Sequence, residues 1–150
     1  MNQPRILSRI NQDEFFGREA EVRDIVRQSS AFPDARTLVV MTTPDAGSSE
    51  LLRQAYDQLF RRRGDLVPIH FAFRRSDGAA VETAKRFFHT LLQQFVAYRR
   101  VNPALCKETL TFHDLLEVAL PGDYELITNL IDGFHREQAV EKDLIDFCLS

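Results

Sequence analysis

The residues of this chain best placed to do chemistry follow an apolar run near position 40. Against the phosphate-binding pattern G-x-x-x-x-G-K-[ST], Gly47 falls at the second glycine, Ser48 at the lysine and Ser49 at the hydroxyl that binds Mg²⁺. Such a loop binds anions because backbone N–H groups and the positive end of a helix converge on them. The residues that we expect to face a phosphate group are Thr43, Ala46, Gly47, Ser48 and Ser49.

The absence of a lysine at position 48 lowers the catalytic activity that we expect of this loop. The only lysines are Lys85, Lys107 and Lys142, none of them near the loop. A hydrogen bond to a charged group is worth about 1.5 to 3 kcal/mol, so its loss weakens phosphate binding by about ten- to a hundredfold. Serine also brings no positive charge to the γ-phosphate in a transition state. We therefore expect weak or absent ATP hydrolysis and assign no catalytic residue.

The loop needs a strand before it and a helix after it. The continuous apolar run Thr37–Thr42 is typical of a strand covered on both faces, and an amphipathic helix follows from Glu50. A helix over about 18–28 precedes the strand. Leu66–Phe73 predicts a second strand, which Pro68 places at a sheet edge. This alternation predicts a parallel α/β fold with right-handed crossovers.

Beyond the second strand the pattern is helical. Ser76 or Asp77 can cap a long helix that reaches Val96. Thr111 and Asp123 can cap two shorter helices.

The second of these helices is expected to break near Gly133, and a last helix runs from Val140 to Cys148. Two parallel strands make a poor sheet, so we expect the fold to continue beyond Ser150. The sequence thus divides into a polar lead-in, an αβ portion and a helical extension, over residues 1–14, 15–100 and 101–150.

A second motif lies upstream, in "FFGREAEV". The pattern F-x-G-R-E-x-E, followed some twenty residues later by strand, loop and "[ST]-E-L-L", resembles the start of the ATPase domain of bacterial STAND-type and origin-recognition-like AAA+ proteins. The resemblance covers Phe15 to Arg99 and implies a P-loop NTPase-like fold that binds ATP and Mg²⁺. It implies that Phe16, Gly17 and Arg18 lie near the base and that Ser49 reaches Mg²⁺.

The chain also departs from that family. Thr42 replaces the first glycine, Asp45 stands where glycine is common, and no apolar strand ends in Asp-Asp or Asp-Glu. One hypothesis is an ATP-binding or vestigial NTPase module of a larger regulatory protein. The alternative is a non-enzymatic protein-interaction scaffold that keeps the same fold, with the loop acting only as a strand-to-helix turn capped by Asp45 or Ser48.

The amino-acid composition reduces the number of partner classes that we expect. The chain is 44% apolar and 27% charged with a net charge of -3, which is typical of a soluble globular protein and gives no reason to expect nucleic acid. No apolar run approaches the roughly 18 residues of a membrane helix, so we expect no membrane partner and a cytoplasmic location. Cys106 and Cys148 form no metal-binding or disulfide pattern. The expected partners are chain beyond Ser150, another protein, or a second copy.

Overall fold

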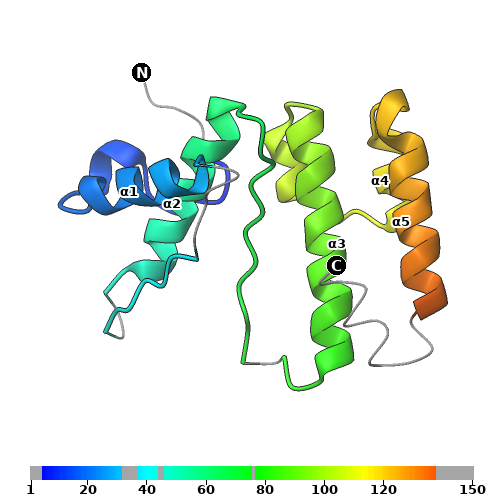
Figure 1. Ribbon diagram of the computed structural model, residues 1–150, viewed down its shortest axis with the longest axis horizontal. Helices are drawn as coiled ribbons and strands as arrows, with labels where there is room; N and C mark the ends of the chain where they lie inside the picture. The colour runs from blue at the N-terminus through cyan, green and yellow to red at the C-terminus, as the bar shows by residue number, and fades with distance from the viewer. Residues whose placement is uncertain (1–4, 32–36, 44–45, 76, 138–150) are drawn as a thin grey trace. The chain divides into compact units, whose positions relative to one another are not determined.

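The computed structural model describes residues 5–31, 37–43, 46–75 and 77–137, and all its regular elements are helices (Figure 1). The α-helices are α1 Glu19–Ser29, α2 Ser48–Arg62, α3 Ala80–Arg99, α4 Phe112–Val118 and α5 Tyr124–Glu137. The short 3-10 helices are η1 Gln12–Glu14, η2 Pro103–Cys106 and η3 Pro121–Asp123. The chain divides into two compact units, Met1–His70 and Phe71–Ser150. Among the described helices, none has the length and apolar character to cross a membrane.

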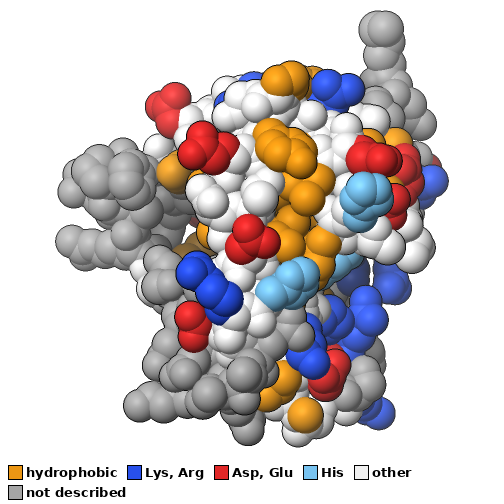
Figure 2. All heavy atoms as spheres, turned by 90° about the vertical axis from the view of Figure 1, so that its right-hand side faces the viewer, with side chains coloured by type: hydrophobic (Ala, Val, Ile, Leu, Met, Phe, Trp, Pro, Cys, Tyr) orange, Lys and Arg blue, Asp and Glu red, His pale blue; other side chains and the backbone are white. Residues whose placement is uncertain are grey.

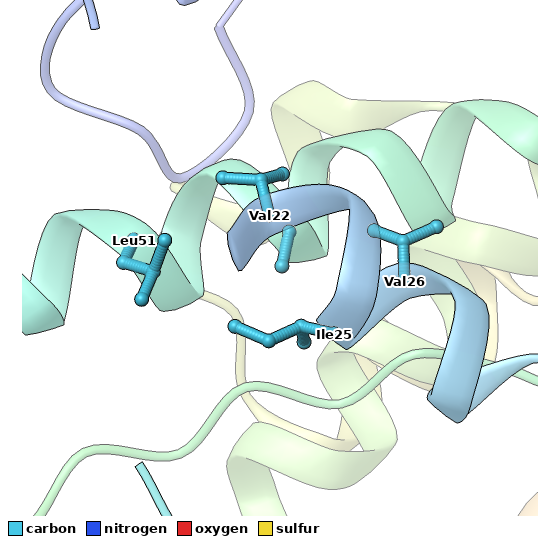
Figure 3. Close-up of a cluster of buried hydrophobic side chains, with 5 residues drawn as sticks. Val22, Ile25, Val26 and Leu51 are labelled. Carbon is cyan, nitrogen blue, oxygen red and sulfur yellow. The ribbon is translucent and has the colours of Figure 1, made fainter. Parts of the chain in front are cut away.

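The first unit is built on the packing of α1 against α2. One face of α1 supplies Val22, Ile25 and Val26, and α2 supplies Leu51 and Ala55, all buried together (Figure 3). Helical spacing puts each set on one side of its helix, so the two apolar stripes cover each other. Partly buried Phe15 and Leu59 pack against this cluster.

A carboxylate on α2 binds the N-terminal segment to this core. Asp57 is fully buried, and its oxygens accept hydrogen bonds from the backbone amides of Ile6 and Leu7 at 2.9 and 2.8 Å. They also accept from the Ser8 hydroxyl at 2.7 Å and from its amide at 3.4 Å. Arg61, one turn further along α2, lies 3.7 Å from the same carboxylate. The buried charge is therefore paired and hydrogen-bonded, as burial of a charge requires.

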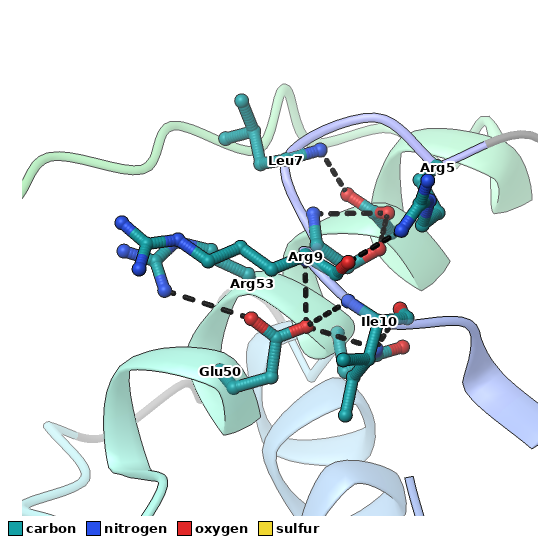
Figure 4. A network of polar contacts seen from close by, with 9 residues as sticks. Arg5, Leu7, Arg9, Ile10, Glu50 and Arg53 are labelled. Carbon is teal, nitrogen blue, oxygen red and sulfur yellow. Dashed lines mark hydrogen bonds and ion pairs between the residues drawn. The ribbon is translucent and has the colours of Figure 1, made fainter. Parts of the chain in front are cut away.

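Glu50, two turns earlier on the same face of α2, holds the next residues of the N-terminal segment (Figure 4). Its Oε1 accepts the amides of Arg9 and Ile10 at 2.9 and 3.3 Å, and its Oε2 lies 3.6 Å from Arg53. Gln54 donates to the Ile10 carbonyl at 2.9 Å. We call residues 6–10, held in this way by Asp57 and Glu50, the N-terminal latch.

The second unit has an aromatic core. The rings of Phe88 on α3 and Phe134 on α5 stack at 4.3 Å with planes 5° apart, and Phe112 at the start of α4 meets both edge-on. These contacts place α3 beside α5 (Figure 1). Leu92, Leu115 and Ile127 extend the core and are all fully buried.

Polar side chains tie the loops of the second unit to α3. Arg99 donates two hydrogen bonds to the Asp123 carboxylate, at 2.8 and 3.0 Å, which joins the end of α3 to η3. Gln93 donates to the carbonyls of Leu105 and Glu108 at 2.6 and 2.7 Å.

Several helix predictions are confirmed. Helices form where the apolar periodicity indicates them, and Thr111 caps α4 in a capping box with Asp114. One cap prediction is wrong, because Asp77 bonds to Arg86 instead of capping α3. Asp123 directly precedes α5, and its carboxylate accepts from Arg99.

The C-terminal helix predictions have mixed outcomes. The expected break near Gly133 is wrong, because α5 runs unbroken to Glu137. Ser76 and the predicted helix from Val140 to Cys148 lie outside the described residues.

The predicted parallel α/β, P-loop NTPase-like fold is wrong. Within the described residues no strand forms, and neither Thr37–Thr42 nor Leu66–Phe73 joins a ladder. Residues 37–43 are all exposed rather than covered on both faces. The physical reason is that a strand is stabilised by a neighbouring strand and a covering layer, while α1 and α2 have already buried their apolar faces against each other.

Replacing Asp57 by asparagine should destabilise the first unit by about 3 kcal/mol, because an amide cannot accept all the hydrogen bonds that the carboxylate receives and buried donors are left unpaired. Urea unfolding measures the loss, and amide hydrogen exchange at Ile6 and Leu7 should accelerate. The matched control is Asp24→Asn, in an exposed pair with Arg27, which should change stability by about 0.5 kcal/mol or less. Equal effects of the two variants would contradict the role of the latch.

Stability of the first unit should fall in mild acid through His70. Burial lowers the pKa of this imidazole below its usual value of 6.5, and the charge of Arg53 lowers it further. The folded state thus favours neutral His70, so its contribution is fully present above about pH 6.5 and decreases as the pH falls through that value. Urea midpoints at about pH 7.5 and 5.5 should differ, and His70→Gln should reduce the difference. Exposed His113 supplies the control, since His113→Gln should leave the difference unchanged.

Candidate functional site

Arg18 brings together the two motifs that the sequence singles out. It occupies the N-cap position of α1, and its Nη1 donates a hydrogen bond to the Ala46 carbonyl at 2.7 Å. Its Nε donates to Glu21 at 3.2 Å. The guanidinium therefore lies at the loop that leads into α2, although 28 residues separate the two ends of the contact.

The loop ends at the N-terminus of α2. Gly47, the N-cap of α2, has φ 74°, a left-handed conformation that glycine adopts without strain. The first intrahelical bond runs from the Leu51 amide to the Gly47 carbonyl at 2.9 Å. The amides of Ser48 and Ser49 lie in the first turn, where α-helices have donors without intrahelical acceptors. The Ala46 amide, in contrast, already donates to the Thr43 carbonyl at 3.2 Å.

Charges of both signs lie around the loop. Among the described residues, Arg18 donates to it, and Glu21 accepts from the same side chain. The hydrogen bond from its own backbone amide, followed by that from Arg18, lowers the pKa of Glu21, which keeps the carboxylate charged. Glu19 accepts from the Gly17 amide at 3.2 Å. A phosphate group at this loop would gain from helix N–H groups and one arginine, against acidic neighbours.

The other predicted site residues lie in the segment before α1 and in the first turn of α2. Phe15 packs against the core, whereas Phe16 is 79% exposed. Gly17 has φ 81° and turns the chain into α1. Ser49 lies in the first turn of α2, and the described residues contain no group of three side chains suited to hold a metal ion.

Immediately before the loop lies an exposed apolar segment, residues 37–43. Exposure alternates along it: Leu38 and Val40 are 44% and 37% exposed, whereas Val39 and Met41 are 75% and 90% exposed. A period of two is the mark of an extended chain that offers two faces. Among the described residues, no backbone group from Leu38 to Thr42 bonds to another part of the chain.

The sequence did not indicate the role of three side chains at this site. Arg18 was expected near a base, and the sequence did not indicate its hydrogen bond to the Ala46 carbonyl. Asp57 and Glu50, which hold the latch, look in sequence like ordinary polar positions of an amphipathic helix. No local pattern distinguishes a carboxylate that faces solvent from one that accepts distant amides.

Comparisons with known proteins identify no relative of this chain. No protein-family model, no characterised protein and no solved structure matches the chain. The resemblance to STAND-type and AAA+ ATPases, with its P-loop and degenerate Walker A interpretation, is therefore corrected: the described residues are helical without strands, and no family match supports it.

Proposed function

We propose that the chain is a non-enzymatic, cytoplasmic binding module that pairs residues 37–43 with an extended strand of a protein partner. The observation that carries this proposal is the exposed segment, in which four large apolar residues follow one another and their backbone groups bond to no other described residue. Contiguous exposed apolar surface marks interaction sites, and an edge with free N–H and C=O groups is a template for strand addition.

Magnitudes are compatible with a weak complex. Burying a valine, leucine or methionine side chain is worth about 1.5 to 3 kcal/mol, so the four residues from Leu38 to Met41 offer about 6 to 12 kcal/mol if fully covered. Association costs about 4 kcal/mol or more. Ladder hydrogen bonds of about 1 kcal/mol each then decide whether the complex is specific.

An alternating valine–threonine peptide of the same length as residues 37–43 should bind saturably, as measured by fluorescence anisotropy. Met41→Glu should weaken binding by about tenfold or more, because it removes an apolar contact worth more than about 1.4 kcal/mol. Leu126→Glu is the matched control, since Leu126 is also an exposed apolar residue, 51% exposed, but lies on α5.

Methylating alternate amides of the peptide should abolish binding, because it removes the ladder donors. Unchanged affinity of the methylated peptide would rule out strand addition. Concentration-dependent association of the chain without peptide would instead make a second copy the occupant.

A second candidate function is weak, non-catalytic binding of ATP with Mg²⁺ at the loop. It is favoured by the Arg18–Ala46 contact, which supplies near Gly47 a cation that Ser48 does not. The amides of Ser48 and Ser49 would hold phosphate and the Ser49 hydroxyl would reach Mg²⁺. Phe16, which is exposed and lies two residues before Arg18 in the sequence, would stack on the base of the nucleotide.

Titration with a fluorescent ATP analogue in the presence of Mg²⁺ should give a dissociation constant of about a millimolar. Arg18→Gln should weaken it by about tenfold, because one charge-assisted hydrogen bond is lost. Arg27→Gln is the matched control on α1, since Arg27 pairs only with exposed Asp24 in the described residues. Absence of a saturable signal, or equal affinity of the Arg18 and Arg27 variants, would exclude this function.

A further inference from the structure

A hollow of about 580 Å³ lies within the second unit, and none of the loop residues described above lines it. It forms where the N-terminal half of α3 meets the start of α4 and the end of α5, with Phe112 and Phe134 among its lining residues. Figure 2 shows histidine side chains beside apolar ones on the face of the molecule that it presents. The volume is in the range of sites for small organic molecules.

The wall of this hollow is aromatic and held in place. Phe134 is buried and stacks on Phe88, and Phe112 meets Phe134 at 5.6 Å with planes 69° apart. The rings of His89 and His135 lie 5.5 and 5.8 Å from Phe112. Rings fixed by one another in this way suit a flat apolar body, which gains from edge-to-face contacts without reordering the site.

One ion pair at the rim of the hollow, between Asp77 and Arg86, already has hydrogen-bond partners for its polar groups. Asp77 accepts from Arg86 through both carboxylate oxygens and from the Arg74 amide at 2.6 Å. Arg86 also donates to the Ala72 carbonyl at 3.0 Å and lies 4.1 Å over the ring of Phe71. The bond that Asp77 accepts from the Arg74 amide, and the bond that Arg86 donates to the Ala72 carbonyl, leave this pair little capacity for a further ligand.

Donors predominate among the other polar groups. Lys85 gives one bond, at 2.9 Å, to Glu82, whose side chain is 70% exposed. An ammonium has three donors, and an exposed ion pair exchanges readily. His89 bonds through Nε2 to the Leu110 carbonyl at 2.6 Å, which requires that nitrogen to carry the proton. Within the described part of the chain, the ring nitrogens of His135 have no hydrogen-bond partner.

We propose that this hollow binds a flat aromatic ring that carries one anionic group. The ring lies against Phe112 and Phe134, and the acid group accepts from Lys85 and His135. Two phenylalanines and six charged or histidine side chains line the hollow, and small-molecule sites combine apolar walls with convergent polar groups in this way. A cation fits less well, because the oxygens of Asp77 are already committed to Arg86 and the Arg74 amide, and Glu82, the other carboxylate that lines the hollow, pairs with Lys85.

Phenyl phosphate is the probe, added to the ¹⁵N-labelled full chain while amide signals are followed by NMR. Saturable shifts should concentrate around Lys85, His89 and His135, with a dissociation constant of about a millimolar. Inorganic phosphate lacks the ring and benzyl alcohol lacks the charge, and each should bind about tenfold more weakly or not at all.

Lys85→Gln should weaken the binding of phenyl phosphate by about tenfold, and so should His135→Gln. Both side chains are solvent-accessible, so the variants should fold. Lys107→Gln, a change at an exposed lysine outside the hollow, should leave the affinity unchanged. Inorganic phosphate or benzyl alcohol binding as well as phenyl phosphate, or the Lys107 variant weakening it as much as the Lys85 variant, would overturn the proposal.

Discussion

The first unit depends on one buried carboxylate. Asp57 lies on the helix that packs against α1, and it accepts the amides of Ile6, Leu7 and Ser8, two of which belong to buried residues. Without the carboxylate those amides would be buried donors with no acceptor, a larger penalty than the loss of an exposed bond. Since Glu50, at the start of the same helix, holds the rest of the latch, the latch also fixes the turn of α2 that begins at Gly47.

The apolar segment before that turn shows why local pattern does not decide burial. The composition of Thr37–Thr42 is that of a covered strand, yet every residue from 37 to 43 is exposed. A sequence indicates that such residues favour burial, but not which surface covers them. In the first unit Val22, Ile25 and Leu51 are already in mutual contact. An apolar surface left over from helix packing is therefore free for another chain.

Local chemistry was predictable where partners are close in sequence. The capping box of Thr111 and Asp114 spans one helical turn, and the sequence predicts Thr111 as the cap correctly. Asp77 and Asp123 have the same capping chemistry but pair with arginines 9 and 24 residues away. A bidentate bond to arginine is stronger than a cap to a neutral amide, and only the fold decides whether an arginine is near. The aromatic hollow likewise joins residues of α3, α4 and α5 that no local motif connects.

The two functions proposed for the first unit share a stretch of chain. Residues 37–43 lead towards Ala46 and Gly47, where Arg18 bonds the loop. A strand paired with that segment would restrict the chain that enters the loop, and a phosphate group bound afterwards would then meet a smaller ordering cost. Thermodynamic reciprocity requires that phosphate favour the strand by the same factor. Because Asp57 and Glu50 bind α2 to the latch, such coupling would pass through the chain that leads into the loop rather than through the helix core.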